Sequence, residues 1–197
     1  VWAGYGGEKV NAAVARVLTG KVNPSGKTAE TFPLSLADVP AYRANRTAEN
    51  AYYEEGRAVG YRYFAKENAP VLFPFGFGLS YSEFRYADLT LKETAQTIEA
   101  SFTVKNLSSC DGKETAQLYF SHKAAEEETQ GDEFALKGFV KIFVAANSET
   151  RAKIEVKKAD LSYYSVSSRE WKRYAGECEI FVGKNCNDLP LQAKINL

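Results

Sequence analysis

The acidic residues are the first candidates for chemistry in this chain of 197 residues, and we find no catalytic pair among them. Hydrolysis by a pair of carboxyl groups needs the two groups to face each other across the scissile bond in a pocket. Glu54 and Glu55 are neighbours, so in an extended segment their side chains point to opposite sides. The acidic run at residues 126–128 lies in a charged insertion, residues 124–132, which we predict to be a solvated loop.

Nucleophile and metal sites have equally little support. His122 is the only histidine, and it follows a predicted strand beside the charged insertion, so we predict a surface histidine. Cys110, Cys178 and Cys186 lack the C-x-x-C spacing of a zinc site, and no cluster has metal-ligand spacing. We expect free thiols, with Cys178 on the buried face of a strand; a Cys178–Cys186 disulfide is the alternative. We predict no cofactor.

Two glycine motifs resemble nucleotide-binding loops but have the wrong spacing. The glycines at residues 4–7 lack a partner at position 9, which is Lys. Between Gly20 and Gly26 there are five residues where a phosphate-binding loop has four, and the following chain leads to Phe32 and Pro33 instead of into a helix. We interpret both motifs as turns.

A group of aromatic residues around Gly56 and Gly60 is the remaining candidate site. Its members are Tyr52, Tyr53, Tyr61, Tyr63 and Phe64. Such rings could stack on the faces of a sugar, or they could pack against a neighbouring domain. We favour packing, because amphipathic Tyr is common wherever a loop is half buried.

Charge and composition exclude several classes of partner. Lys plus Arg equals Asp plus Glu at 25 each, so no overall field draws the chain to nucleic acid or to an anionic membrane. No apolar run is long enough to cross a bilayer.

Two sequons for N-glycosylation, at residues 45–47 and 106–108, would matter only in a secreted eukaryotic protein. No signal peptide is visible at Val1, and we slightly favour a cytoplasmic location.

The opening residues predict one helix that needs a cover. Residues 1–3 look like the end of a buried strand, and a helix should begin near Glu8 and stop at Gly20. One face of this helix would be apolar, formed by Val10, Ala13, Val14, Val17 and Leu18. Because an isolated helix with this stripe would be unstable in water, we infer that a sheet outside the sequence covers it.

The middle of the chain shows no sustained periodicity. Residues 34–69 predict a long ordered loop with short extended pieces. Residues 71–81 alternate large apolar side chains with Pro74, Gly76 and Gly78, so they cannot form a long helix. We expect a sharply turning hinge that packs between its neighbours and joins two domains, residues 1–81 and 82–197.

The last part of the chain predicts an all-β domain. Seven short segments alternate apolar and polar residues between turn signals, and they fall at residues 84–91, 97–106, 114–121, 139–144, 150–156, 178–182 and 191–195. About seven strands of this length are typical of an immunoglobulin-like sandwich. The predicted fold class is therefore mixed, with an incomplete α/β segment followed by an all-β sandwich.

Three motifs in the first part resemble the C-terminal part of glycoside hydrolase family 3, the β-glucosidase family. They are NPSGKTAETFP at 23–33, YEEGRAVGYRYF at 53–64 and FPFGFGLSY at 73–81. Three later motifs resemble the family's terminal fibronectin type III-like domain: GKETAQLY at 112–119, LKGFVK at 136–141 and GECEIFVG at 176–183. The resemblance covers essentially the whole chain.

This resemblance implies a role in retaining hydrolysis of terminal β-linked glucose, with β-xyloside as the alternative substrate. In the family the nucleophilic Asp lies in a barrel domain and the acid/base Glu usually lies upstream in the α/β sandwich domain. Neither motif occurs here, so we assign no catalytic residue. The expected partners are the remainder of the same enzyme and, through it, a carbohydrate. A free-standing carbohydrate-binding or adhesion module is the alternative function.

Overall fold

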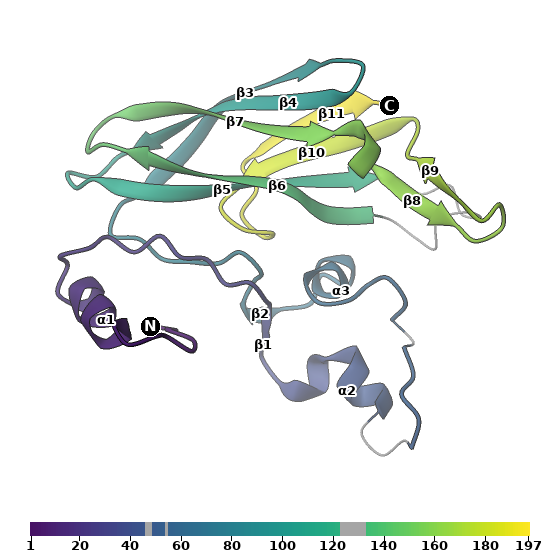
Figure 1. Ribbon diagram of the computed structural model, residues 1–197, viewed down its shortest axis with the longest axis horizontal. Helices are drawn as coiled ribbons and strands as arrows, with labels where there is room; N and C mark the ends of the chain where they lie inside the picture. The colour runs from purple at the N-terminus through teal and green to yellow at the C-terminus, as the bar shows by residue number, and fades with distance from the viewer. Residues whose placement is uncertain (46–48, 54, 123–132) are drawn as a thin grey trace.

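The computed structural model describes residues 1–45, 49–53, 55–122 and 133–197, and its main body is a β-sandwich. Residues 1–81, here called the N-terminal segment, run along one side of this sandwich (Figure 1). The fold is mixed, as predicted, with short helices confined mainly to this segment. Within the described ranges, no helix has the length and apolar character needed to span a membrane.

The N-terminal segment contains short helices and one small sheet. Its elements are α1 (Val10–Leu18), β1 (Phe32–Pro33), the 3-10 helix η1 (Leu36–Asp38), α2 (Pro40–Asn45), α3 (Tyr61–Lys66) and β2 (Val71–Phe73), and β1 pairs antiparallel with β2. The prediction of a loop with extended pieces over 34–69 was therefore wrong. Six-residue helices are too short to show a periodic pattern, and only the Ser35–Asp38 capping box and Pro40 at a helix start signal them.

Helix α1 forms as predicted and is only partly covered, with Val10, Val14 and Val17 half-buried. It ends before Gly20, whose φ of +71° favours glycine. None of its residues is buried, and Leu18 is 64% exposed. The strand predicted at residues 1–3 is absent, and Trp2 is 75% exposed. A strand needs a neighbour to complete its hydrogen bonds, and no described strand pairs with these residues.

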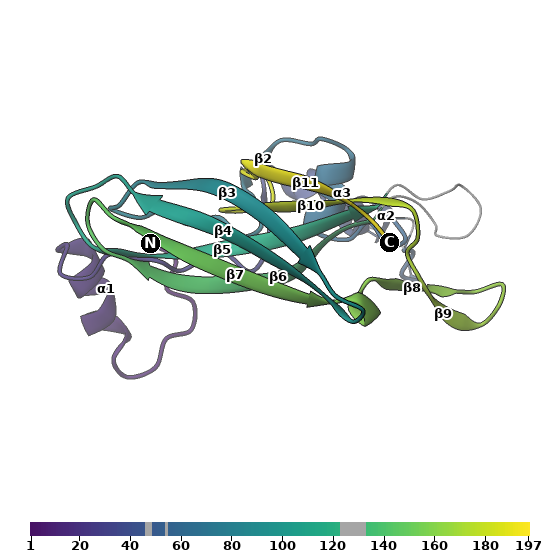
Figure 2. The same ribbon diagram turned by 90° about the horizontal axis from the view of Figure 1, so that it is seen from above.

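The sandwich consists of two antiparallel sheets, seen from above in Figure 2. Sheet order is β11-β10-β5-β6 in one and β3-β4-β7 in the other. The strands are β3 (Phe84–Glu93), β4 (Thr97–Asn106), β5 (Gly112–His122), β6 (Glu133–Val144), β7 (Glu149–Lys157), β10 (Glu177–Gly183) and β11 (Leu191–Asn196). All seven predicted strands are confirmed.

The hydrophobic core lies between these two sheets. Its centre is fully buried and includes Phe102 and Val104 of β4, Leu118 and Phe120 of β5, and Ile180 of β10. These positions recur every second residue on their strands, as a sheet with one face on a core requires. The alternation visible in the sequence thus sets the inner face of both sheets.

The structure also contains a hairpin that the sequence analysis missed. After the 3-10 helix η2 (Lys158–Asp160), strands β8 (Ser162–Ser165) and β9 (Glu170–Arg173) pair only with each other and extend from the sandwich (Figure 1). Tyr163 packs on Tyr174 of the core, whereas Tyr164 and Trp171 face outward. Four-residue strands are too short for a clear alternation.

His122 was predicted to be on the surface, and the structure contradicts this. It is buried at the end of β5, its Nε2 lies 3.0 Å from the Ala175 carbonyl oxygen, and its ring contacts Tyr174. His122 lies two residues after Phe120 and four after Leu118, so its side chain points inward like theirs. This strand alternation decides its burial, although charged residues follow it in the sequence. The predicted solvated loop at 124–132, including the acidic run at 126–128, lies outside the described residues.

The second sequon is inaccessible in the fold. Asn106 is buried, and its Nδ2 donates to the carbonyl oxygens of Cys110 at 2.8 Å and Val144 at 3.1 Å. A glycan on this nitrogen would break both hydrogen bonds. The sequon at 45–47 includes residues outside the described ranges.

All three cysteines are free thiols, as predicted, but their surroundings differ. Cys110 is exposed, whereas Cys178 and Cys186 are buried, and burial raises the pKa of each of these two thiols to about 11. A raised pKa lowers the fraction of reactive thiolate at any pH below it.

We therefore expect iodoacetamide at pH 8 to label Cys110 rapidly in the folded chain and to label the other two only after unfolding. Peptide mass spectrometry of labelled samples reads out each site. Removal of the fast phase by Cys110→Ser is the control, and fast labelling of Cys178 in folded protein would contradict the assignment.

Candidate functional site at the outer face of the four-stranded sheet

The outer face of the four-stranded sheet is covered by the turn that follows β2. Gly76 donates from its N–H to the Thr28 carbonyl oxygen at 2.9 Å, and the Thr28 N–H donates to the Phe77 carbonyl oxygen at 2.7 Å. A Cβ on Gly76, which has φ of +80°, would lie 2.1 Å from Gln117 Oε1, and a Cβ on Gly78 would lie 2.1 Å from the Gly26 carbonyl oxygen. The glycines therefore permit the backbone to approach the sheet closely.

Gln117 connects this turn to the sandwich through a buried amide. Its Nε2 donates to the carbonyl oxygens of Gly76 at 3.0 Å and Lys184 at 2.6 Å, and its Oε1 accepts from the Tyr119 hydroxyl at 2.7 Å. Gln117 and Tyr119 are buried although they point away from the core. The outer face of β5 is therefore an internal contact, in which burial raises the pKa of Tyr119.

Asn23 makes a second polar contact between the two parts. Its Oδ1 accepts from the Ser80 hydroxyl at 2.8 Å and from the Tyr81 N–H at 2.9 Å. Its Nδ2 donates to Ser82 Oγ at 2.8 Å and to the Asp111 carbonyl oxygen at 2.9 Å. Both donors and both lone pairs of the amide are used, so this side chain fixes its own loop relative to two other segments, residues 80–82 and Asp111.

Lys27 and Glu114 form a buried ion pair at the same interface. Lys27 Nζ lies 3.1 Å from Glu114 Oε1, and the two side chains are only 12% and 4% exposed. Glu114 also accepts from the Tyr86 hydroxyl at 2.9 Å. Burial raises the pKa of Tyr86, and the charge of Glu114 raises it further. The pair therefore favours one alignment of the N-terminal segment on the sandwich, and the removal of both charged groups from water opposes that gain.

Tyr61 is the member of the predicted aromatic group that reaches the sandwich. Its ring stacks on Phe75 with centroids 4.6 Å apart and lies edge-on to Tyr119 and Phe134. Its hydroxyl accepts from the Leu136 N–H at 2.9 Å. These contacts join α3 to the hinge, β5 and β6.

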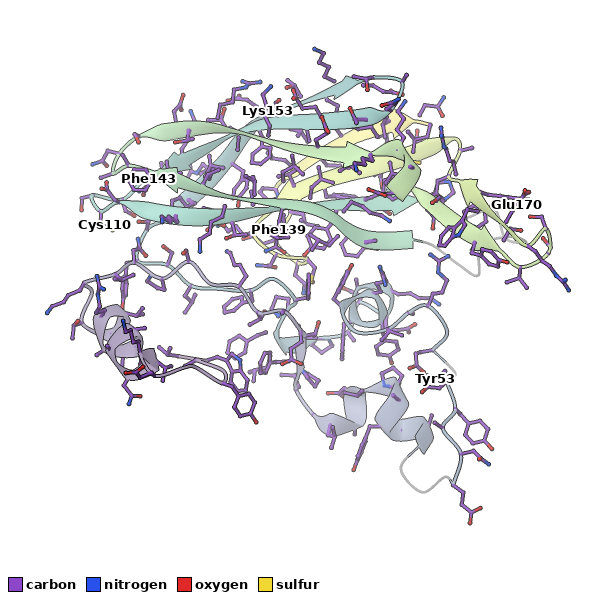
Figure 3. The ribbon with its side chains drawn as sticks, viewed as in Figure 1. Tyr53, Cys110, Phe139, Phe143, Lys153 and Glu170 are labelled. Carbon is purple, nitrogen blue, oxygen red and sulfur yellow. The ribbon has the colours of Figure 1, made fainter. Side chains whose placement is uncertain are left out.

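The other predicted aromatics lie in three different environments. Phe64 is buried in α3. Tyr63 contacts Phe64 and accepts a hydrogen bond from the Arg43 guanidinium at 2.6 Å. Tyr52 and Tyr53 are 53% and 76% exposed (Figure 3 labels Tyr53). The structure thus places the five residues along one segment without gathering them on one platform, and their role toward a sugar stays a prediction.

The carboxylates offer no assembled catalytic pair among the described residues. Glu54 lies outside them, and Glu55 Oε2 is buried with no hydrogen-bond partner there. Glu114 is held by Lys27. No group of three or more His, Cys, Asp or Glu with metal-site geometry occurs in the described ranges.

Sequence reasoning missed the polar contacts made by Gln117, Asn23, Lys27 and Glu114. The sequence does hold a signal for Gln117. The residues that alternate with it along β5 are already apolar and face the core, so Gln117 must lie on the outer face. Where a sheet is covered on both faces, its strands no longer alternate simply between apolar and polar residues. Asn23 and Lys27 lie inside a quoted motif, but their partners are 57 or more residues away in sequence.

Two family profiles match this chain. The glycosyl hydrolase family 3 C-terminal domain matches residues 1–81, and the fibronectin type III-like domain matches residues 114–186.

Relatives of known name agree with these profiles. Thermostable beta-glucosidase B of Acetivibrio thermocellus is 37% identical over 98% of this chain and 26% of its own length. An exo-alpha-(1->6)-L-arabinopyranosidase of Bifidobacterium breve is 34% identical over 93% of this chain and 24% of its own length. The crystal structure of beta-glucosidase from Kluyveromyces marxianus in complex with glucose has a TM-score of 0.89 and 34% identity, covering 98% of this chain and 24% of that chain. This chain spans about a quarter of the length of these relatives.

The buried ion pair predicts a strong effect of single substitutions. Lys27→Met or Glu114→Gln alone should destabilise the chain by about 3–5 kcal/mol, because each substitution leaves the charge of the other residue buried without a partner of opposite charge. The double variant should cost less than the sum of the two. Urea unfolding measures all three, with the exposed pair Lys194–Glu177 as the control, whose removal should leave the midpoint unchanged. Additive single effects would contradict the assigned pairing.

Tyr61 and Tyr53 should differ in the same assay. Tyr61→Ala removes a ring stack and leaves the Leu136 N–H without its acceptor, so we expect a loss of about 2 kcal/mol. Tyr53→Ala removes an exposed ring and should leave the unfolding midpoint unchanged. Equal effects of both substitutions would show that the α3 contact does not stabilise the fold.

Proposed function

We propose that this chain forms the C-terminal part of a retaining β-glucosidase of glycoside hydrolase family 3 and carries neither the nucleophile nor the acid/base. The observation behind the proposal is that both profiles match, in the chain order of the family's C-terminal region, on a chain that spans a quarter of its relatives. The domain boundary that we propose lies between residues 81 and 82.

In this proposal the chain braces the catalytic parts of the enzyme. Helix α1 supports it, because its apolar stripe is only partly covered in the described chain: Val10, Val14 and Val17 are half-buried and Leu18 is 64% exposed. An apolar stripe is stable in water only when another element buries it. The covering element is, in our proposal, the rest of the α/β domain, held in a fixed position relative to the sandwich by Gln117 and Asn23.

The sugar is the less determined part of the proposal. We take terminal β-linked glucose as the substrate, with β-xyloside as the alternative. The arabinopyranosidase among the relatives shows that proteins similar in this region carry names for other sugars. The residues that select the sugar belong, in this proposal, to the catalytic parts of the enzyme, so substitutions in the sandwich should leave sugar preference unchanged.

A carbohydrate-binding or adhesion module is the second candidate. The observation that favours it is the outward pair on the β8–β9 hairpin, where Tyr164 and Trp171 are 50% and 72% exposed with ring centroids 5.7 Å apart. Tyr52 and Tyr53 add two more exposed rings. A rim of Trp and Tyr can bind a sugar face, so this candidate predicts affinity for oligosaccharides without hydrolysis.

Hydrolysis of an aryl β-glucoside distinguishes the two candidates. The purified chain, its mass of 21.8 kDa verified, should show no turnover. A longer polypeptide that contains this chain together with the family's catalytic domains should be active. Turnover by the chain alone would overturn the proposal and make Glu54 and Glu55 the first residues to mutate. Binding of cello-oligosaccharides by the chain alone, abolished by Trp171→Ala, would favour the second candidate.

A further inference from the structure

The outer faces of the two sheets of the sandwich differ in character. On the three-stranded sheet the outward side chains are polar and pair across strands, as Lys153 does with Glu99 at 3.0 Å and Lys105 with Glu149 at 3.0 Å. Among the described residues of β3, β4 and β7, no large apolar side chain is highly exposed. This face is typical of one that contacts water.

The outer face of β6 carries two exposed phenylalanines instead. Phe139 and Phe143 are 67% and 53% exposed, and Figure 3 labels both along this strand. They alternate with Val140 and Ile142, which pack on the core, so their outward direction follows from the strand period. Within the described parts of the two main sheets, these are the large apolar side chains that are more than half exposed.

The exposed phenylalanines continue an existing interface. In the register of the sheet, Phe139 is opposite Gln117 and Phe143 is opposite Lys113 of β5, so these pairs share the outer face. The N-terminal segment already covers Gln117 and contacts Thr115 through the Ser25 carbonyl oxygen. It also contacts the first part of β6, where Tyr61 accepts from the Leu136 N–H and its ring meets Phe134, whereas Phe139 and Phe143 further along the strand remain exposed.

The loop after α1 reaches the same end of the sheet. Asn23 donates to the Asp111 carbonyl oxygen, and Asp111 Oδ1 accepts from the Ala146 N–H at 2.9 Å, two residues after β6 ends. Helix α1 lies below this end of the sandwich in Figure 1, and Figure 2 shows it at the same end. The partly covered stripe of α1 and the exposed phenylalanines of β6 therefore lie on neighbouring parts of one side.

We propose that Phe139 and Phe143 form a docking surface for the same part of the enzyme that covers α1. This inference rests on the proposed function, in which about three quarters of the protein lies outside this chain. The occupant presents an apolar surface to the two rings. It also carries carboxylates, because exposed Lys113 and Lys141 flank Phe143 and Phe139 on the same face. The catalytic part thus contacts the sandwich directly, as well as through the N-terminal segment.

Hydroxyl-radical footprinting tests this surface at the level of side chains. The 197-residue chain and the long β-glucosidase that contains it are oxidised under identical conditions, and peptide mass spectrometry gives the rate at each residue. We expect Phe139 and Phe143 to react at least fivefold more slowly in the long protein. Lys153-bearing peptides from the polar sheet should show no such protection. Equal rates for the two phenylalanines in both proteins would overturn the inference.

A substitution pair gives an independent test. Phe139→Ser/Phe143→Ser should leave the thermal midpoint of the 197-residue chain unchanged, because both rings are exposed there, and should lower the midpoint of the long protein. Tyr164→Ser/Trp171→Ser is the matched control and should lower neither. A long protein whose midpoint is unaffected by the phenylalanine substitutions would overturn the inference.

Activity separates this inference from the proposed function. If the long protein hydrolyses an aryl β-glucoside while Phe139 and Phe143 react freely with hydroxyl radicals, the proposed function holds and the docking surface is wrong. If the phenylalanines are protected and the long protein has no glycosidase activity, the docking surface holds as a contact between the two parts and the proposed reaction is wrong.

Discussion

Burial of both faces of β5 around Gln117 and Tyr119 is the constraint on which the rest of the structure depends. At these two positions the polar groups of the outer side must be satisfied from within the protein, because both side chains are shielded from water. Gln117 meets this requirement with two donated hydrogen bonds and one accepted bond, to Gly76, Lys184 and Tyr119. Without Gly76 the turn could not approach, and without the turn the Gln117 amide would be desolvated and unpaired.

The contact that follows from this constraint is largely polar and therefore specific. Asn23 uses its whole amide, and Lys27 brings a charge to a buried carboxylate. Such interactions add little net stability but penalise every other alignment of the two parts. A polar contact of this kind suits a brace, because it holds the N-terminal segment in one orientation to the sandwich. In the docking that we propose, the apolar surfaces on α1 and β6 then bind the part of the protein that lies outside this chain.

Sequence reasoning predicted the elements in which one face is apolar and the other polar. The seven strands follow from alternation, and the stripe of α1 follows from helical spacing. It failed where two environments compete at one position. His122 is followed by charged residues but continues the inward phase of β5, and Gln117 is polar but buried. Helices α2 and α3 and the β8–β9 hairpin are too short to show a period, so tertiary contacts such as those of Tyr61 and Tyr163 stabilise them.

Amide hydrogen exchange of the 197-residue chain tests most directly whether the N-terminal segment and the sandwich are one body. The informative amides are those of Thr28, Gly76 and Phe77, which donate within the turn that covers Gln117. We predict that they exchange with the slow rates of β5, whereas the amides of α1 exchange quickly because no residue of that helix is buried. Exchange of the turn at the rate of α1 would contradict the account, since the outer face of the sheet would then open independently of its core.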